Sequence, residues 1–148
     1  MEITKEPNKI LHKKLELVPE ITPDIIALIE EMRRTMIEAK GVGLAANQIG
    51  KDLQIFVIAK NIADEHKVPD AYINPVMNEF SRDRDEMEEG CLSIPGFWHQ
   101  IRRSKKVHIK ALDERGNKIK LKAKGFLARV FQHEYDHLQG KLIKDRVN

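Results

Sequence analysis

Hydrophobic residues recur at helical spacing near the end of the chain, where residues 126–138 contain no Gly or Pro. Gly125 and Gly140 bracket this run, as expected of helix boundaries. His133 and His137 occupy the stripe beside the apolar one. The pattern therefore predicts a helix that is buried along the side carrying both histidines. The positions that form its stripe are Leu127, Val130, Phe131, Glu134 and Leu138.

An earlier helix is predicted to begin after Thr22 and to end at Gly41. Thr22 is suited to be its N-cap, Pro23 its first residue, and Asp24 an acidic residue in its first turn. Met32 and Met36 are expected in the core. The predicted buried stripe comprises Ile25, Ile26, Leu28, Ile29, Met32, Met36 and Ile37.

Shorter apolar runs predict strands. Residues 53–59 form a nearly continuous apolar strand, and residues 71–77 form a second strand that bends at Pro75. The polar residues 61–70 are expected to be a surface loop, and the charged residues 81–87 a turn region.

Residues 107–111 and 119–123 alternate apolar and polar side chains, which predicts an antiparallel hairpin. Its outward lysines are most simply a solvated face that protects a sheet edge, and contact with nucleic acid is the less favoured alternative. His108 is expected to be structural. The lysines are Lys118, Lys120, Lys122 and Lys124.

Two glycine-containing segments lie between these elements. Residues 41–50 hold three glycines and two alanines, which suits a tight connection or a close backbone approach to a ligand, and Gln48 is its long polar side chain. Residues 88–96 place Cys91 in a short strand-like element that Pro-Gly closes. Phe97 and Trp98 follow and either cap the core or wall a pocket.

Together these elements predict an α+β fold of residues 1–148 as a single domain, with small antiparallel sheets around a central helix. The formal net charge of +3 is too small to argue for nucleic-acid binding, and no specific DNA contact is expected. No apolar run is long enough for a membrane span and no signal-peptide core is present, so a cytoplasmic protein is expected.

The strongest chemical motif is His133-Glu134-x-x-His137. On a helix, this spacing puts both imidazoles on one face, where they can share a metal ion. Glu134 lies too close to His133 to be a third ligand, but it can take a proton from a water on the metal. The alternative for this motif alone is two core or surface histidines at chance spacing.

After His137 only Asp145 is an acidic candidate ligand, and no further histidine follows, so a third ligand is expected upstream. Cys91, in a glycine-flanked segment, is the strongest candidate because a thiolate is a good metal ligand and a metal lowers its pKa. Two imidazoles, one thiolate and one water make a tetrahedral catalytic site. The upstream histidines lack comparable surroundings.

Three segments in this order resemble the peptide deformylases: Gly41-Val42-Gly43-Leu44-Ala45-Ala46-Asn47-Gln48, Glu89-Gly90-Cys91-Leu92-Ser93 and Gln132-His133-Glu134-Tyr135-Asp136-His137. The resemblance spans essentially the whole chain. It implies that Cys91, His133 and His137 bind the metal and that Glu134 is the general acid and base. Gln48 and the Leu92 N–H would stabilise the oxyanion. It also implies substrate-binding roles for Val42, Gly43, Glu89, Gly90, Phe126, Arg129 and Val130.

The resemblance further implies removal of the N-formyl group from the initiator methionine of nascent peptides, with release of formate. It implies Fe²⁺ as the working ion, while the donor set also permits Zn²⁺, Ni²⁺ or Co²⁺. Many family members carry an arginine near the pocket rim where this chain has Trp98. Many also have a C-terminal helix linked to ribosome docking, which this sequence does not show, so a ribosome contact cannot be assumed from that helix. Asp136 is expected to pair with Arg103.

Two other functions use the same residues. One is an endopeptidase or another amidase with the same metal, which is disfavoured because no downstream third ligand is visible. The other is a metal-stabilised binding module that places the lysine-rich hairpin on ribosomal RNA, in which Glu134 and Gln48 would have no task.

Overall fold

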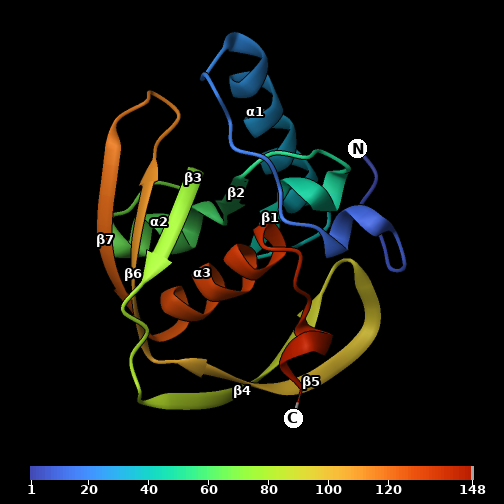
Figure 1. Ribbon diagram of the computed structural model, residues 1–148, viewed down its shortest axis with the longest axis vertical. Coiled ribbons are helices and arrows are strands. Elements are labelled where there is room, and N and C mark those ends of the chain that lie inside the picture. Colours follow the sequence, from blue (N-terminus) through green and yellow to red (C-terminus); the bar gives the residue numbers. More distant parts are fainter. Residues whose placement is uncertain (148) are drawn as a thin grey trace.

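A computed structural model describes residues 1–147 as an α+β fold, as the sequence predicted (Figure 1). A five-stranded antiparallel sheet has the strand order β1-β2-β3-β6-β7, and β4 and β5 form a separate antiparallel pair. The strands are β1 (Gly43–Ala45), β2 (Ile55–Ile58), β3 (Ala71–Asn78), β4 (Arg84–Cys91), β5 (Ile94–Ser104), β6 (Lys106–Leu112) and β7 (Lys118–Lys124). The helices are α1 (Pro23–Glu38), α2 (Lys60–His66) and α3 (Gly125–Leu138), with 3₁₀ turns at Lys9–His12, Ala46–Ile49 and Ile143–Arg146.

The two faces of the large sheet bury different elements, which explains why β2 is apolar at every position. Phe56 faces α3, where it packs with Tyr72 and Phe131 at ring-centroid separations of 5.0 and 5.9 Å. Ile55 and Val57 point to the opposite face and pack under α1. The central helix α3 thus lies between the large sheet and the β4–β5 pair (Figure 1). Both histidines of the motif are on this helix.

Helix α1 begins as predicted, with the Thr22 hydroxyl accepting a hydrogen bond from the N–H of Ile25. It ends earlier than predicted, because Lys40 takes a left-handed conformation (φ 57°) and the N–H of Gly41 bonds back to the Met36 carbonyl. This is the Schellman arrangement, in which Gly41 lies one residue beyond the left-handed position. Ile37 was placed wrongly in the buried stripe, since its side chain is 70% exposed.

The β4–β5 pair is the main departure from the sequence-based expectations. The predicted turn region at residues 81–87 instead leads into β4, and Pro95 and Gly96 lie within β5 rather than closing a short element. Five successive residues of β4 are exposed, so no alternation marks it as a strand. Pairing with β5 over the whole length of β4 produces the strand instead.

The other departure is α2, which replaces part of the expected loop at residues 61–70. This short helix has no side-chain cap and only two buried residues, so its sequence carries little helical signal. The bend expected at Pro75 is confirmed as a register shift between Ile73 and Val76, next to Asn74 in a left-handed conformation. Within residues 1–147, no helix is long and apolar enough to cross a membrane.

Candidate metal centre and active site

The histidines are positioned by α3, which is tied to the chain around it by amide side chains. The Asn47 amide donates to the His137 carbonyl (2.8 Å), and the Gln54 amide donates to the Leu138 carbonyl (3.3 Å). One turn earlier than His137, the Gln132 amide pairs with both backbone groups of Ser104, at 3.1 and 2.8 Å. These bonds fix the rotation and depth of the helix, so its polar face meets β4 and β5.

Cys91 ends β4, and the turn Leu92-Ser93 leads directly into β5. This turn brings the sulfur beside α3, and Cys91 Sγ lies 3.3 Å from His137 Nε2. One ligand atom from each of Cys91, His133 and His137 falls within 4.8 Å of the other two. The structure therefore brings together the three residues that the sequence proposed as ligands.

The donor set and its spacing fit a divalent cation. In a tetrahedral site with metal–sulfur and metal–nitrogen bonds of about 2.3 and 2.0–2.1 Å, neighbouring ligand atoms are roughly 3.5 Å apart. Burial, followed by the nearby His133, lowers the pKa of His137 well below its usual value, which keeps that imidazole neutral and able to donate a lone pair.

Positive charge is favoured at His133. Burial opposes its protonation, but the Cys91 sulfur and the Glu89 carboxylate outweigh burial and raise the pKa of His133 to about 10. A dication bound at the same place would satisfy these negative groups instead of that proton, so metal binding is expected to release protons.

The carboxylate of Glu89 fixes the orientation of the His133 ring. Its Nδ1 lies 2.9 Å from Glu89 Oε1, which leaves Nε2 facing the other two candidate ligands, Cys91 and His137. This is the usual outer arrangement of a metal-binding histidine. Burial tends to raise the pKa of Glu89, but hydrogen bonds from His133 and Arg103 prevail and lower it to about 2. Glu89 is therefore ionised at neutral pH.

Glu89 belongs to a buried network of charges. Arg103 donates to both of its oxygens at 3.0 and 2.9 Å, and Arg129 donates to it as well. Arg103 also bonds to Asp136 (2.6 Å), which confirms the pairing expected from the sequence. All four residues are at most 7% exposed. Their two positive and two negative charges balance, as buried ions require.

Two residues that the sequence analysis did not single out close the network at its ends. Arg146 chelates Asp136 with bonds of 3.0 and 2.7 Å, and Asp85 accepts a 2.8 Å bond from Arg129. Neither lies in one of the three motif segments, so only the folded chain reveals them. The guanidinium of Arg129 is engaged in this network, although Arg129 also lines the cleft described below.

The buried carboxyl group of Glu134 is suited to proton transfer. Its side chain is 3% exposed, and its Oε1 has no hydrogen-bond partner within residues 1–147. Burial raises the pKa of Glu134 to about 7 against the opposing effect of His133. Oε2 lies 4.0 Å from His133 Nε2. A β-carbon on Gly43 would lie 2.6 Å from this carboxylate, so the glycine leaves the room that Glu134 needs.

Two hydrogen bonds fix the orientation of the Gln48 amide, so that its nitrogen points at the group formed by Cys91, His133 and His137. Its Oε1 accepts a bond from the N–H of Ala45 (3.0 Å), and its Nε2 donates to the Ser93 hydroxyl (3.1 Å). The same Nε2 lies 3.6 Å from Cys91 Sγ. Ser93 is fully buried and was missed as a site residue, although it closes the Glu-Gly-Cys-Leu-Ser segment.

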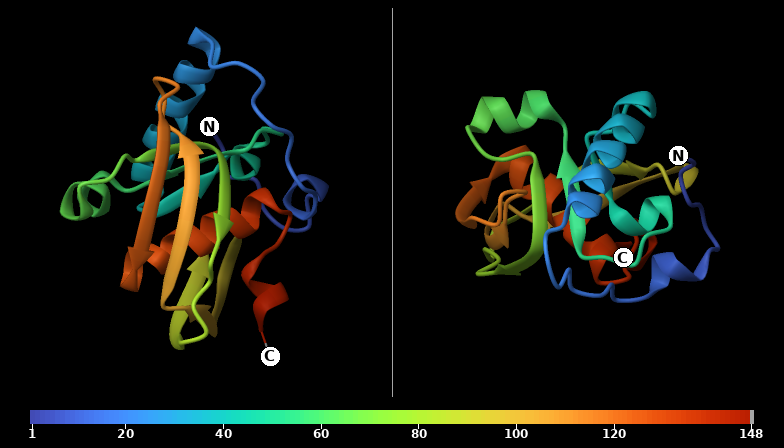
Figure 2. Two further views of the ribbon diagram at one scale, coloured as in Figure 1. Left: turned by 60° about the vertical axis from the view of Figure 1, so that its left-hand side comes forward. Right: turned by 90° about the horizontal axis from the view of Figure 1, so that it is seen from above.

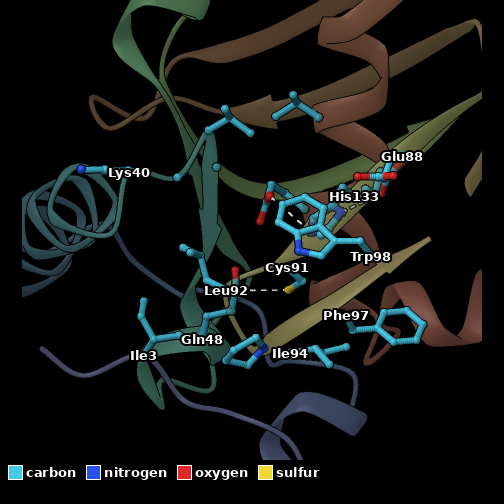
Figure 3. A pocket seen from close by; sticks show the side chains of 18 of the residues that line it. Ile3, Lys40, Gln48, Glu88, Cys91, Leu92, Ile94, Phe97, Trp98 and His133 are labelled. Atoms are coloured by element: carbon cyan, nitrogen blue, oxygen red, sulfur yellow. Dashed lines mark hydrogen bonds and ion pairs between the residues drawn. The ribbon is translucent and has the colours of Figure 1, made fainter. Parts of the chain in front are cut away.

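A cleft of about 650 Å³ opens beside the cluster (Figure 3). Trp98 lies over it with an indole that is 64% exposed, and a β-carbon on Gly90 would come within 2.4 Å of that ring. Gly90 therefore provides the flat surface on which Trp98 rests. The candidate residues that line the cleft are Val42, Gly43, Gln48, Glu89, Gly90, Cys91, Leu92, Phe126, Arg129, Val130, His133 and Glu134.

The family model for polypeptide deformylases matches residues 1–148. A peptide deformylase of Thermodesulfovibrio yellowstonii is 40% identical over all of this chain and 89% of that protein, and peptide deformylase 1 of Clostridium perfringens is 46% identical over 93% of this chain and 91% of its own. The crystal structure of the Thermotoga maritima peptide deformylase has a TM-score of 0.92 at 37% identity, covering 99% of this chain and 97% of that one. A peptide deformylase from Synechococcus elongatus, solved with actinonin, has a TM-score of 0.92 at 36% identity, covering all of this chain and 79% of that one.

Replacing Arg103 by leucine is expected to lower the free energy of unfolding by about 3–5 kcal/mol, because Glu89 and Asp136 would lose a buried partner. Arg102→Leu is the matched control. This neighbour makes only an exposed pair with Glu86 and should cost no more than about 1 kcal/mol. Urea denaturation measures both, and equal losses would contradict a stabilising role for the buried network.

The ion pairs of Glu89 also predict a pH dependence. Since the fold lowers the pKa of this carboxyl from 4.5 to about 2, its contribution to stability is present above pH 4.5 and disappears as the pH falls towards 2. The difference in unfolding free energy between the parent protein and Glu89→Gln should therefore shrink across that range. Glu86→Gln serves as the control on the same strand. If the difference in unfolding free energy between the parent protein and Glu89→Gln stays constant down to pH 2, the lowered pKa of Glu89 is refuted.

Proposed function

The chain belongs to the polypeptide deformylase family, and we propose that residues 1–148 act as a single catalytic domain in which Cys91, His133 and His137 bind the metal. The protein is a metal-dependent hydrolase that removes the N-formyl group from nascent chains. The observation that carries the ligand assignment is the convergence of one sulfur and two imidazole nitrogens beside a buried glutamate oxygen. That oxygen has no hydrogen-bond partner among residues 1–147.

A divalent cation held by these residues would supply Lewis-acid chemistry and make a water more acidic. Glu134 takes the proton from that water and later delivers it to the leaving amine, for which a pKa near neutrality is well suited. The peptide leaves with a free amino terminus, and formate is the second product.

The Gln48 amide and the Leu92 N–H are proposed to donate to the negative oxygen that develops on the formyl group. Gln48 is prepared for this because Ala45 and Ser93 hold its amide before any substrate arrives. A preorganised donor of this kind is worth roughly 3 kcal/mol of barrier. Since the amide does not need to reorient during the reaction, little of that gain is lost.

Substrate would lie along the cleft, with the backbone at Gly43 and Gly90 holding an extended peptide. Apolar surface for the methionine side chain is supplied by Val42, Phe126 and Val130, which line the cleft. Val42 and Phe126 are each nearly half exposed there. Arg129 and Glu89 are proposed to support this wall through their ion pair. The close contact between Gly43 and Glu134 leaves little room for an acyl group larger than formyl.

We propose Fe²⁺ as the working ion, with Zn²⁺, Ni²⁺ or Co²⁺ as substitutes that the same donors accept. The thiolate of Cys91 would make an iron-loaded enzyme sensitive to oxidation. Formate release under anaerobic conditions should be faster with iron-loaded than with zinc-loaded protein. Activity that is higher with zinc in the absence of oxygen would contradict this choice.

The remaining proposals concern where the enzyme works. We propose that it acts in the cytoplasm on N-formylmethionyl nascent peptides, and that it contacts the ribosome on which those peptides are made. Neither a membrane nor a specific DNA sequence is expected as a partner.

Glu134→Gln keeps the size of the side chain but removes the proton acceptor. Formate release from a formyl-Met peptide is expected to fall about 10²- to 10⁴-fold, while metal content measured by atomic spectrometry stays unchanged. Full activity in this variant would remove Glu134 from the acid–base role. Loss of metal together with activity would instead make it a ligand.

Ser93 is proposed as a positioning residue that acts through Gln48. Ser93→Ala is expected to lower kcat about tenfold with little change in KM, because a misaligned amide forfeits part of the oxyanion stabilisation. In a Gln48→Ala background, Ser93→Ala should have almost no further effect on kcat. Additive losses in the double variant would show that Ser93 acts by another route.

A further inference from the structure

One face of the β6–β7 hairpin carries six exposed lysines. The strands alternate, so every second residue points away from α3, and these outward positions are mostly lysine. None of the six lines the active-site cleft. We refer to this surface as the lysine face, and it comprises Lys106, Lys110, Lys118, Lys120, Lys122 and Lys124.

The strand register sets like charges directly against each other. Lys106 pairs with Lys124 and Lys110 with Lys120, and such pairs destabilise a sheet. Within residues 1–147 none of the six lysines makes a salt bridge. Nearby acidic residues bond elsewhere: Glu79 pairs with His108, and in the hairpin turn Asp113 bonds to Asn117 and Glu114 to Arg33.

Protection of a sheet edge explains only part of this arrangement. Lysines along β7 suit an edge strand, which must avoid pairing with other chains. However, β6 is an interior strand between β3 and β7, where no edge needs protection. Edge protection therefore does not account for the exposed lysines at 106 and 110.

The lysine face carries more positive charge than the chain has in excess. The formal net charge is +3, which is smaller than the six positive charges of this one face, so the remainder of the chain is net negative. Anions of high charge density are thus attracted to this face.

The lysine face is open because α1 covers only part of that side of the sheet. The side chains packed under α1 come from β1, β2 and the start of β3, and Leu112 lies at the margin of this cluster. Beyond it the outer surface of β6 and β7 is uncovered (Figure 2). Val76, on the neighbouring strand opposite Lys110, is the adjacent exposed hydrophobic residue. A membrane-binding surface would need more aromatic or aliphatic side chains than this.

We infer that the lysine face docks on the phosphate backbone of ribosomal RNA. The lysines of β7 follow one another every two residues, about 6.6–6.8 Å apart, and those of β6 are four residues apart. They present point charges without planar side chains that read bases. Binding would depend on backbone charge rather than on sequence. The inference rests on the proposed ribosome contact and gives that contact a location. It orients the enzyme without engaging the residues of the active site.

The test compares two double variants with the same change in charge. Lys110→Gln with Lys120→Gln removes one opposed pair from the lysine face, whereas Lys14→Gln with Lys51→Gln removes two exposed lysines located outside the hairpin. Binding is measured by fluorescence anisotropy with a labelled RNA duplex of about 16 base pairs, and by co-sedimentation with purified ribosomes. Salt is varied between about 50 and 200 mM.

The expected result is about tenfold weaker RNA binding for the hairpin variant, with a salt slope smaller by about 1–2, and near-parental binding for the control. Deformylation of a short formyl-Met peptide should be unchanged in both variants. Equal weakening by the two variants, or no binding by the parent protein at about 100 mM salt, would overturn the inference. Tighter binding to vesicles of phosphatidylserine and phosphatidylcholine than to RNA would also overturn it. Since peptide activity is measured separately, these failures are distinct from a failure of the catalytic proposal.

Discussion

The carboxylate of Glu89, buried between His133, Arg103 and Arg129, is the constraint on which the rest of the site depends. It connects β4 and β5 to α3 by charged hydrogen bonds. Burying these ions is costly, and a hydrophobic replacement of the whole set could be equally stable. What the network provides is one fixed orientation of the His133 ring relative to the Cys91 sulfur, which a purely apolar interface would specify less strictly.

The same network explains why residues so far apart in the chain meet at one point. Cys91 lies on the β4–β5 pair, while both histidines lie on α3. The ion pairs and the hydrogen bonds of Gln132 to Ser104 join these elements. Gly43 completes the arrangement from the large sheet by leaving space for Glu134. The active site is therefore assembled where three structural units meet, and the sequence motifs are the segments at that junction.

Local signals in the sequence predicted a large part of this fold. The N-cap of α1, the periodicity of α3 and the alternation of β6 and β7 each depend on neighbouring residues, and these features form as expected. Patterns of neighbouring residues did not predict β4 and β5, because these two strands stabilise each other by pairing. The ligand candidates were accessible through motif spacing, whereas Arg146 and Ser93 gain their contacts only through long-range packing.

The central claim is that one sulfur and two imidazole nitrogens bind the same ion, and X-ray absorption at the metal edge tests it most directly. Protein loaded with zinc should show one sulfur at about 2.3 Å and two nitrogens at about 2.0–2.1 Å, with a light atom completing the shell. The sulfur contribution should vanish in Cys91→Ser. A shell of nitrogen and oxygen alone in the parent protein would contradict the account.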